Sequence, residues 1–427
     1  MVKPVITSDK KDWRFYINSP KNIFYTILIT GTIVSLVLCI LTQGQTLENM
    51  LYRDREDYFM DYFNSIRYSA FGPYANFDVI YPAFMMIIYY YIGVVLKSFG
   101  VVFEDSSEGA FGLRDSIPGI ASYFLITFVF LIILYLIIRK NLDMDRKEKI
   151  VFFLLILFSY PMLFTIDRGN SILWTYVFIL LFLALYDSKK KNERYLSYVF
   201  LGIAVATKMY PAIFGLLVLN KSIENKKMKD LLICVFIVAT LLFVPFIFTD
   251  GSFIGIIQDA TEYSGYIWSI GHVNITGIVE TTAYLIGIGS YPPLQTISSV
   301  ISIMLMAIII FIVIFDREAR LWETITLLTG TLVLCAGVGA EYLLLYIAIS
   351  AWYFVKEDVQ DSRRDRIIAI LMAVILVLLP GPWPFFSLGI PYFKAICLLM
   401  LILIIMIPGL KRAINNISKK FSVRILN

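Results

Sequence analysis

Long apolar runs constrain this sequence more than any other feature. Such runs lie near 23–41, 120–138, 231–248, 296–315 and 391–408. Each approaches the roughly 20 apolar residues that a helix needs to cross the hydrocarbon core of a bilayer. A spanning segment must also satisfy its own backbone hydrogen bonds, which favours helices. The chain, 59% hydrophobic, is therefore predicted to be an all-α polytopic membrane protein. Its net charge of +5 is no sign of nucleic-acid binding.

The distribution of Lys and Arg predicts how the chain is oriented. Most of the 37 Lys and Arg lie in the N-terminal segment, in five short loops and in the tail. The loops read "RKNLDMDRKEK", "DSKKKNER", "NKSIENKKMKD", "DREAR" and "KEDVQDSRRDR", and the tail begins "KRAINNISKK". Because Lys and Arg collect on the cytoplasmic side, both termini are expected inside. The N-terminal segment shows no cleavage site and is expected to be retained.

This orientation requires that one apolar segment does not cross. We choose "YPAFMMIIYYYIGVVLKSF" (81–99), which is rich in Tyr and carries Lys97 near its end. It is expected to be a juxtamembrane helix embedded at the outer face, and a full crossing is the open alternative. About twelve crossings then remain, near 23–41, 120–138, 150–166, 171–187, 195–207, 210–220, 231–248, 296–315, 321–337, 340–355, 366–380 and 391–408.

The unusual polar segments then share the outer side, and the first is "YRDREDYFMDYFNSIRY" (52–68). At about 100° per residue, Asp57 and Asp61 fall on one helical face, with Phe59 and Phe63 opposite. This pattern predicts an amphipathic helix along the outer leaflet. Two carboxylates one turn apart can serve a general base that activates a hydroxyl. The alternative is an acidic interfacial helix that is ion-paired with its own arginines.

Two cationic residues on the outer side suit a phosphate. Lys208, in "TKMYP", lies where two short helices break. It either binds a lipid phosphate as a point charge or extends to the membrane interface. Arg168, in "DRGN", either binds phosphate through two nitrogens or belongs to an ion-paired turn in which Asn170 caps the next helix.

Two further polar segments are weaker candidates. His272 and Asn274, in "GHVNITG", can donate hydrogen bonds to a sugar or phosphate, or can be ordinary loop residues. His272 is the single histidine, so the sequence predicts no histidine-rich metal site. Glu341, in "GAEY", either faces the site or belongs to an interfacial belt.

Taken in order, these blocks resemble the GT-C superfamily of membrane glycosyltransferases, and within it glycosyltransferase family 87. The blocks are D-x3-D-Y-F-N (57–64), "GPY" (72–74), "YPAF" (81–84), "DRGN" (167–170), "ATKMYPAIFGLLVLN" (206–220), "NITG" (274–277) and "EYLLLYIAISAW" (341–352). The resemblance runs from about residue 20 to residue 356. In this chain "YPAF" replaces the more usual Y-P-P.

The resemblance implies a reaction and its residues. The general base falls on Asp57, with Asp61 as the open alternative, and Lys208 lies near the donor phosphate together with Tyr210 of the same block. The remaining binding residues that it implies are Arg168, Asn170, His272, Asn274 and Glu341. It implies a polyprenyl-phosphate sugar donor, a glycan or glycolipid acceptor, inversion at the sugar, and no metal or cofactor. The site would face outward from the cell membrane.

We expect a GT-C-like catalytic membrane domain over 1–356, including an outer loop at 43–119. Residues 357–427 are expected to add C-terminal transmembrane helices and a basic cytoplasmic tail. Two rivals remain at this stage. A transporter or flippase would more often show internal repeats and charges within its spans. A lipid-saccharide ligase or polymerase with a diphosphate-linked donor would be expected to carry more outer arginines.

Overall fold

A computed structural model describes residues 19–51, 57–224, 228–266, 272–288, 292–336, 340–357, 362–379 and 389–425. Within these ranges every regular element is a helix, and none is a strand. The first half contains α2 (Pro20–Leu41), α3 (Gln45–Met50), α4 (Met60–Ala70), α5 (Ala83–Ser98), α6 (Ser107–Asp115), α7 (Ile117–Asn141), α8 (Arg146–Leu157), α9 (Tyr160–Arg168), α10 (Ile172–Leu185), α11 (Lys191–Thr207), η2 (Tyr210–Phe214) and α12 (Gly215–Glu224). The second half contains α13 (Met228–Phe243), η3 (Val244–Phe248), α14 (Phe253–Tyr266), α15 (Ile275–Leu285), α16 (Pro292–Phe315), α17 (Leu321–Leu334), η4 (Glu341–Tyr346), α18 (Ile347–Lys356), α19 (Arg363–Leu376) and α20 (Gly389–Ile425).

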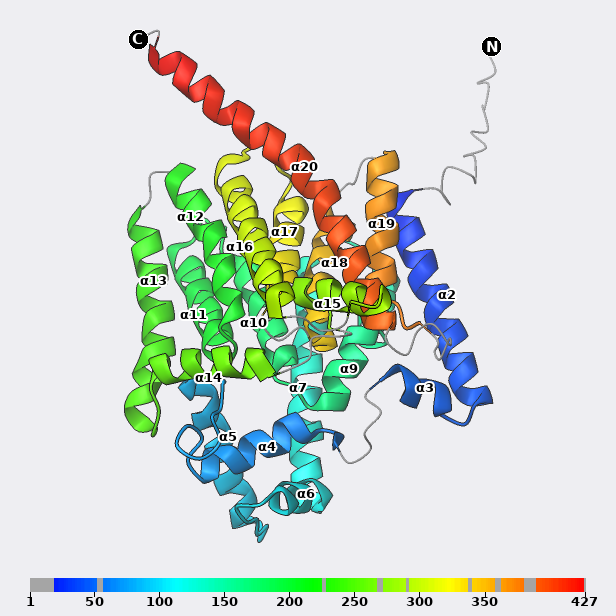
Figure 1. Ribbon diagram of the computed structural model, residues 1–427, viewed down its shortest axis with the longest axis vertical. Coiled ribbons are helices and arrows are strands. Elements are labelled where there is room, and N and C mark those ends of the chain that lie inside the picture. The colour runs from blue at the N-terminus through cyan, green and yellow to red at the C-terminus, as the bar shows by residue number, and fades with distance from the viewer. Residues whose placement is uncertain are drawn as a thin grey trace, which may run out of the picture.

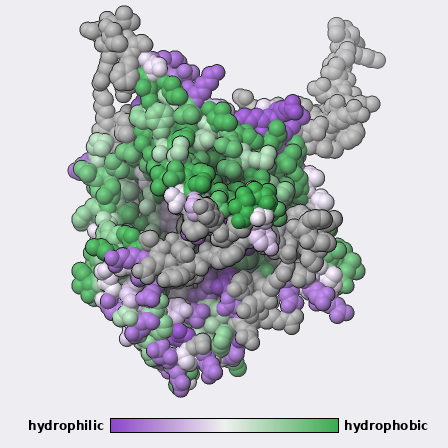
Figure 2. Space-filling model, in the orientation of Figure 1, coloured by the Kyte–Doolittle hydropathy of each residue, from purple (hydrophilic) through white to green (hydrophobic). Residues whose placement is uncertain are grey.

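Among the described residues, five helical segments are long and apolar enough to cross a membrane: Pro20–Leu41, Ile117–Asn141, Met228–Phe248, Pro293–Phe315 and Gly389–Lys419. A sixth is the pair α8 and α9, bent by 55° at their junction, where Pro161 lies in the first turn of α9 and cannot continue the hydrogen bonding of the preceding helix. Figure 2 shows a broad hydrophobic band over the helices, with hydrophilic residues gathered below it and at its upper edge. An apolar surface of this extent indicates contact with lipid.

The helices of the interior are shorter. α10, α17 and α18 are almost fully buried by the rest of the protein, so their apolar side chains face other helices instead of lipid. Within the described residues, each of the twelve expected crossings overlaps a helix or a helix pair. Five or six of them pass the test of length and composition, and the count of twelve stays a prediction.

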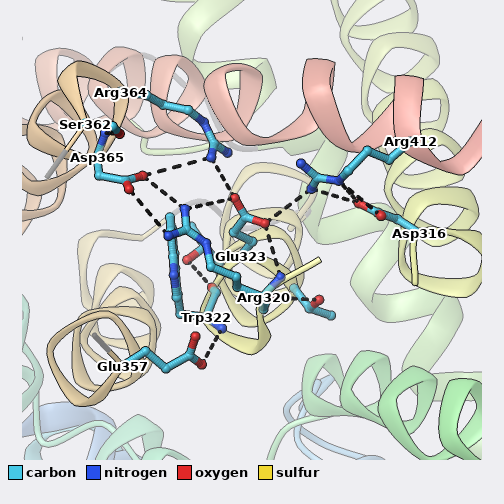
Figure 3. A network of polar contacts seen from close by, with 11 residues as sticks. Asp316, Arg320, Trp322, Glu323, Glu357, Ser362, Arg364, Asp365 and Arg412 are labelled. Carbon is cyan, nitrogen blue, oxygen red and sulfur yellow. Dashed lines mark hydrogen bonds and ion pairs between the residues drawn. The ribbon is translucent and has the colours of Figure 1, made fainter. Parts of the chain in front are cut away.

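A network of buried ion pairs joins three of the basic segments at one end of the bundle (Figure 3). Glu323, on α17, accepts from Arg320, from Arg364 at the start of α19 and from Arg412 on α20. These arginines also pair with Asp365 and Asp316. The segments "DREAR", "DSRRDR" and "KRAINN" therefore lie together, as the orientation argument expects. Each buried carboxylate faces a guanidinium, which offsets the cost of its desolvation.

The opposite end of the bundle carries α4, α5 and α6 (Figure 1). α5 packs against α4 where Gly93 lies under Ile66. α5 has 16 residues, about 24 Å at 1.5 Å per residue, which is shorter than a full crossing requires. Its placement at the outer face stays a prediction.

The region between α13 and α16, where no crossing was expected, is helical in part. It contains α14 and α15, which run across the bundle (Figure 1). Asn274 begins α15 because its side-chain oxygen accepts the backbone N–H of Gly277. Asn is a favoured N-cap residue, so this signal was present in "NITG".

The C-terminal helices pack closely on the first span. α19 lies against α2, where Gly31 leaves room for Val377 and the Ser35 hydroxyl donates to the Leu378 carbonyl over 2.8 Å. The division of the chain at residue 356 stays a proposal.

Candidate functional site

The centre of the site is one guanidinium held between two carboxylates. Arg168, the last residue of α9, donates from Nη1 to Asp57 Oδ2 over 2.5 Å and from Nη2 to Asp61 Oδ1 over 2.6 Å. The side chains of Arg168, Asp57 and Asp61 are 16%, 30% and 17% exposed. From the sequence, Arg168 was expected to bind phosphate, as one of two alternatives. In the structure it fixes the positions of both candidate bases.

The helix that carries the carboxylates is shorter than the sequence predicts. α4 begins at Met60, so Asp61 lies in its first turn and Asp57 lies in the turn before it. The reason is Phe59, which has a positive φ of 62° and donates its N–H to the Asp167 carbonyl oxygen over 2.8 Å. This bond ties the turn before α4 to the end of α9.

The "DRGN" turn is shaped to receive that partner. Gly169 ends α9 with φ 68°, a conformation that glycine adopts without a steric penalty. A Cβ at Gly169 would lie 2.7 Å from the Phe59 carbonyl oxygen. The next residue, Asn170, is buried; it donates from Nδ2 to Asp61 Oδ2 over 2.7 Å and accepts the Ile172 N–H over 3.1 Å. Asn170 therefore positions Asp61 and accepts the first N–H of α10.

Lys208 is the second cation of the site. It follows α11 directly and is only 5% exposed. Its Nζ lies 3.8 Å from the centre of the Tyr81 ring. Within the described part of the chain, its Nζ makes no hydrogen bond or ion pair. Burial lowers the pKa of Lys208 to about 7, against the opposing effect of the Asp61 charge. Lys208 and Asp61 are thus close enough to interact.

Tyr81 links Lys208 to the carboxylates. Burial raises the pKa of its phenol well above the usual value, and the Asp61 charge acts in the same direction. The Tyr81 carbonyl accepts the Tyr74 hydroxyl over 2.7 Å. "GPY" and "YPAF" therefore meet at the site, where Tyr81 was not predicted to have a role. The signal was available, since a Tyr before Pro82 adjoins the same outer loop.

The remaining predicted residues are spread around this centre. Glu341 is the first residue of η4, which packs on α9, and the positive charge of Arg168 acts on its carboxyl group. Asn274 uses both ends of its amide, accepting from Gly277 as described above and donating to the Ala336 carbonyl over 2.9 Å. Among the described contacts, none links His272 to Arg168 or Lys208. Its Nδ1 is buried without a hydrogen bond to the described residues, and burial lowers its pKa.

A largely apolar cavity of about 810 Å³ begins two residues beyond Lys208. Tyr210 lies on its wall, and the other walls come from α11, α12, α13, α16 and α17. α13 and α16 belong to segments long enough to cross the membrane. Polar lining is limited to Tyr210, Thr331, Cys234, Cys335 and backbone. The cavity therefore suits a hydrocarbon chain.

The family model of glycosyltransferase family 87 matches residues 110–345. The chain belongs to this family. As a member of family 87, it is a membrane glycosyltransferase that moves a glycosyl group from a donor to an acceptor. The matched residues include Arg168, Lys208 and Tyr210, whereas Asp57 and Asp61 precede them. No curated protein and no solved structure matches the chain.

Family 87 membership favours a transferase over the transporter and flippase considered from the sequence. The features around the site fit a transferase as well. Carboxylates and two cations lie where α4 begins and α9 and α11 end, and an apolar cavity starts two residues beyond α11's Lys208 C-cap. This arrangement brings together groups able to accept a proton, to bind an anion and to hold a lipid.

Proposed function

We propose that this protein transfers a sugar from a polyprenyl-phosphate donor to a hydroxyl of a lipid-linked or cell-envelope glycan, on the outer face of the cell membrane. One observation carries the proposal: the wall of the apolar cavity begins at Tyr210, two residues from Lys208, and the charge of Asp61 acts on Lys208. A lipid chain in the cavity would bring its phosphate to Lys208 and its sugar toward Asp57.

Asp57 is the better base of the two carboxylates. Asp61 accepts hydrogen bonds on both oxygens, from Arg168 and Asn170. Asp57 accepts from Arg168 on Oδ2, and its Oδ1 accepts no hydrogen bond from the described residues. Asp57 is also the more exposed of the two. Its Oδ1 is therefore free to take a proton, while Asp61 and Asn170 hold the guanidinium in place.

The proposed step is a single displacement. Asp57 takes the proton of the acceptor hydroxyl as its oxygen attacks the anomeric carbon. The bond from that carbon to the phosphate oxygen breaks, and its electron pair remains on the phosphate, which gains a second negative charge. Lys208 stabilises this charge, with Arg168 close by. Attack from the side opposite the leaving group inverts the anomeric carbon. The leaving phosphate needs no general acid.

The distribution of basic residues supports an outward-facing site. "DREAR", "DSRRDR" and "KRAINN" meet at the end of the bundle opposite α4 (Figures 1 and 3), and such segments favour the cytoplasmic side.

The test uses the full-length protein in lipid nanodiscs. It is supplied with a panel of polyprenyl-phosphate sugars and a glycan acceptor, and released polyprenyl phosphate is measured. Asp57→Asn should lower the turnover about 10²–10⁴-fold, the range expected for a general base. Asp115→Asn, whose exposed carboxylate pairs with Arg114 on α6, is the matched control. Full activity of the Asp57→Asn variant refutes the assignment of Asp57 as the general base. Nucleotide-sugar and diphosphate-linked donors are assayed in parallel. If the protein turns over only these, a polyprenyl-phosphate donor is refuted.

A further inference from the structure

Lys208 is an unusual buried cation because of what faces it. Arg168 forms ion pairs with two carboxylates, and buried Lys394 donates to three backbone carbonyls. Lys208, almost as deeply buried, has the face of an aromatic ring at 3.8 Å as its contact among the described residues. An ammonium over a ring is attracted by the ring quadrupole, yet the ring carries no charge that would cancel its own.

Contacts of the Tyr81 backbone fix the position of its ring. Its carbonyl accepts the Tyr74 hydroxyl, and Pro82 follows it as the N-cap of α5. A residue before proline is restricted to extended conformations. The Tyr74 ring in turn packs on Phe246 and directly over Gly251. The ring under Lys208 is therefore set by backbone that is itself anchored.

We propose that Tyr81 is a positioning residue that holds the Lys208 ammonium on its ring face and leaves its charge available to the donor phosphate. This inference rests on the proposed function for its substrate. It assigns a role to the tyrosine of "YPAF", which touches the cation and not the reacting atoms. A carboxylate in the place of Tyr81 would bind the ammonium more tightly, but it would neutralise the charge that the phosphate needs.

The charge of Lys208 depends on all the groups around it. Asp61 acts on Lys208 directly. Other ionisable groups of the described chain close to this assembly include Arg168 from α9 with its partner Asp57, Tyr89 from α5, Tyr210 from η2 and Tyr342 from η4. Because burial lowers the pKa of Lys208 to about 7, the protonated fraction falls as the pH rises through neutrality. Removal of the Tyr81 ring removes a contact that stabilises protonated Lys208. The Lys208 ammonium therefore loses its proton at a lower pH.

Two substitutions separate the ring from its hydroxyl. Tyr81→Phe keeps the ring face and should retain the donor KM of the wild type. Tyr81→Leu removes the ring and should raise the donor KM about tenfold, with the alkaline limb of kcat/KM shifted about one pH unit lower, as expected for a desolvated cation–π contact. Tyr90→Leu, on an exposed part of α5, is the matched control.

A second measurement needs no substrate. Acetylation of Lys208 by acetic anhydride, followed by mass spectrometry across a pH series, reports the neutral amine. The midpoint should be the same in wild type and Tyr81→Phe, and about one unit lower in Tyr81→Leu, the shift that corresponds to a tenfold change. Equal midpoints for Tyr81→Leu and Tyr81→Phe overturn the inference, and so does a Tyr81→Phe as impaired as Tyr81→Leu. Failure of every polyprenyl-phosphate donor overturns the proposed function alone, since this midpoint is measured without it.

Discussion

Replacement of Arg168 by Lys tests the arrangement of the site most directly. The guanidinium reaches Asp57 with one nitrogen and Asp61 with another. A lysine offers one nitrogen on a flexible stem and cannot reproduce that planar fork. We expect one of the two charge-assisted hydrogen bonds to be lost. Such a bond is worth about 1.5–3 kcal/mol. If all of it bears on the placement of the base, the rate falls about 10–150-fold.

The assay is the release of polyprenyl phosphate under saturating donor, with kcat and KM determined separately. The loss should appear in kcat, because the proposed role of Arg168 is to place Asp57 and not to bind the lipid chain. Arg114→Lys is a matched control, since Arg114 pairs with neighbouring Asp115 on the surface of α6. Because the Asp115 carboxylate is 66% exposed, its pair with Arg114 contributes little, and this variant should behave as wild type.

The double substitution Arg168→Lys with Asp57→Asn completes the cycle. If Arg168 acts through Asp57, the two losses do not add, because the second change removes what the first had displaced. A kcat for Arg168→Lys within twofold of wild type would refute the reasoning. Additive losses would mean that Arg168 acts on the reaction independently of the base.

Three further outcomes are expected. Gly169→Ala forces a Cβ against the backbone of the turn before α4 and should lower stability by about 1–3 kcal/mol, whereas Gly112→Ala, in open space, should not; thermal unfolding in detergent measures both. Glu323→Gln removes the buried carboxylate that three arginines share, although they keep Asp365 and Asp316, and should lower stability by about 1.5–3 kcal/mol, seen in the same assay. Val238→Trp fills the apolar cavity and should raise the KM for long polyprenyl donors more than for short ones, whereas Phe236→Trp on the exposed face of α13 should leave both unchanged.

The charge pattern predicted more of the architecture than the apolar pattern did. "DREAR", "DSRRDR" and "KRAINN" were expected on one side, and their arginines share carboxylates in one network. Apolar composition could not separate α10 or α17, which are surrounded by protein, from α13, which presents most of its surface outward. A buried helix and a spanning helix need similar residues, so composition alone leaves them alike.

The candidate site was predicted as a set of residues and not as a set of contacts. Asp57 and Arg168 were proposed separately, as a base and as a phosphate ligand. Their ion pair joins positions far apart in the chain, and no local pattern specifies such a partner. Helical periodicity extended through Asp57 because it takes no account of the Phe59 N–H, which bonds to Asp167. Tertiary contact therefore decided where α4 begins.

The contacts of Lys394 predict how the last two helices insert into the membrane. It lies in α20, fully buried, with its ammonium donating to the carbonyls of Val374, Ile375 and Val377 at the end of α19. A lysine alone in hydrocarbon costs about 2.5–3.5 kcal/mol on translocon scales. Because α19 is synthesised first, the carbonyls at its end are present at the translocon, able to accept from Lys394, when α20 is synthesised. We expect the two helices to enter the lipid as a hairpin, so that truncation before Lys394 leaves α19 with exposed carbonyls and marks the nascent protein for degradation.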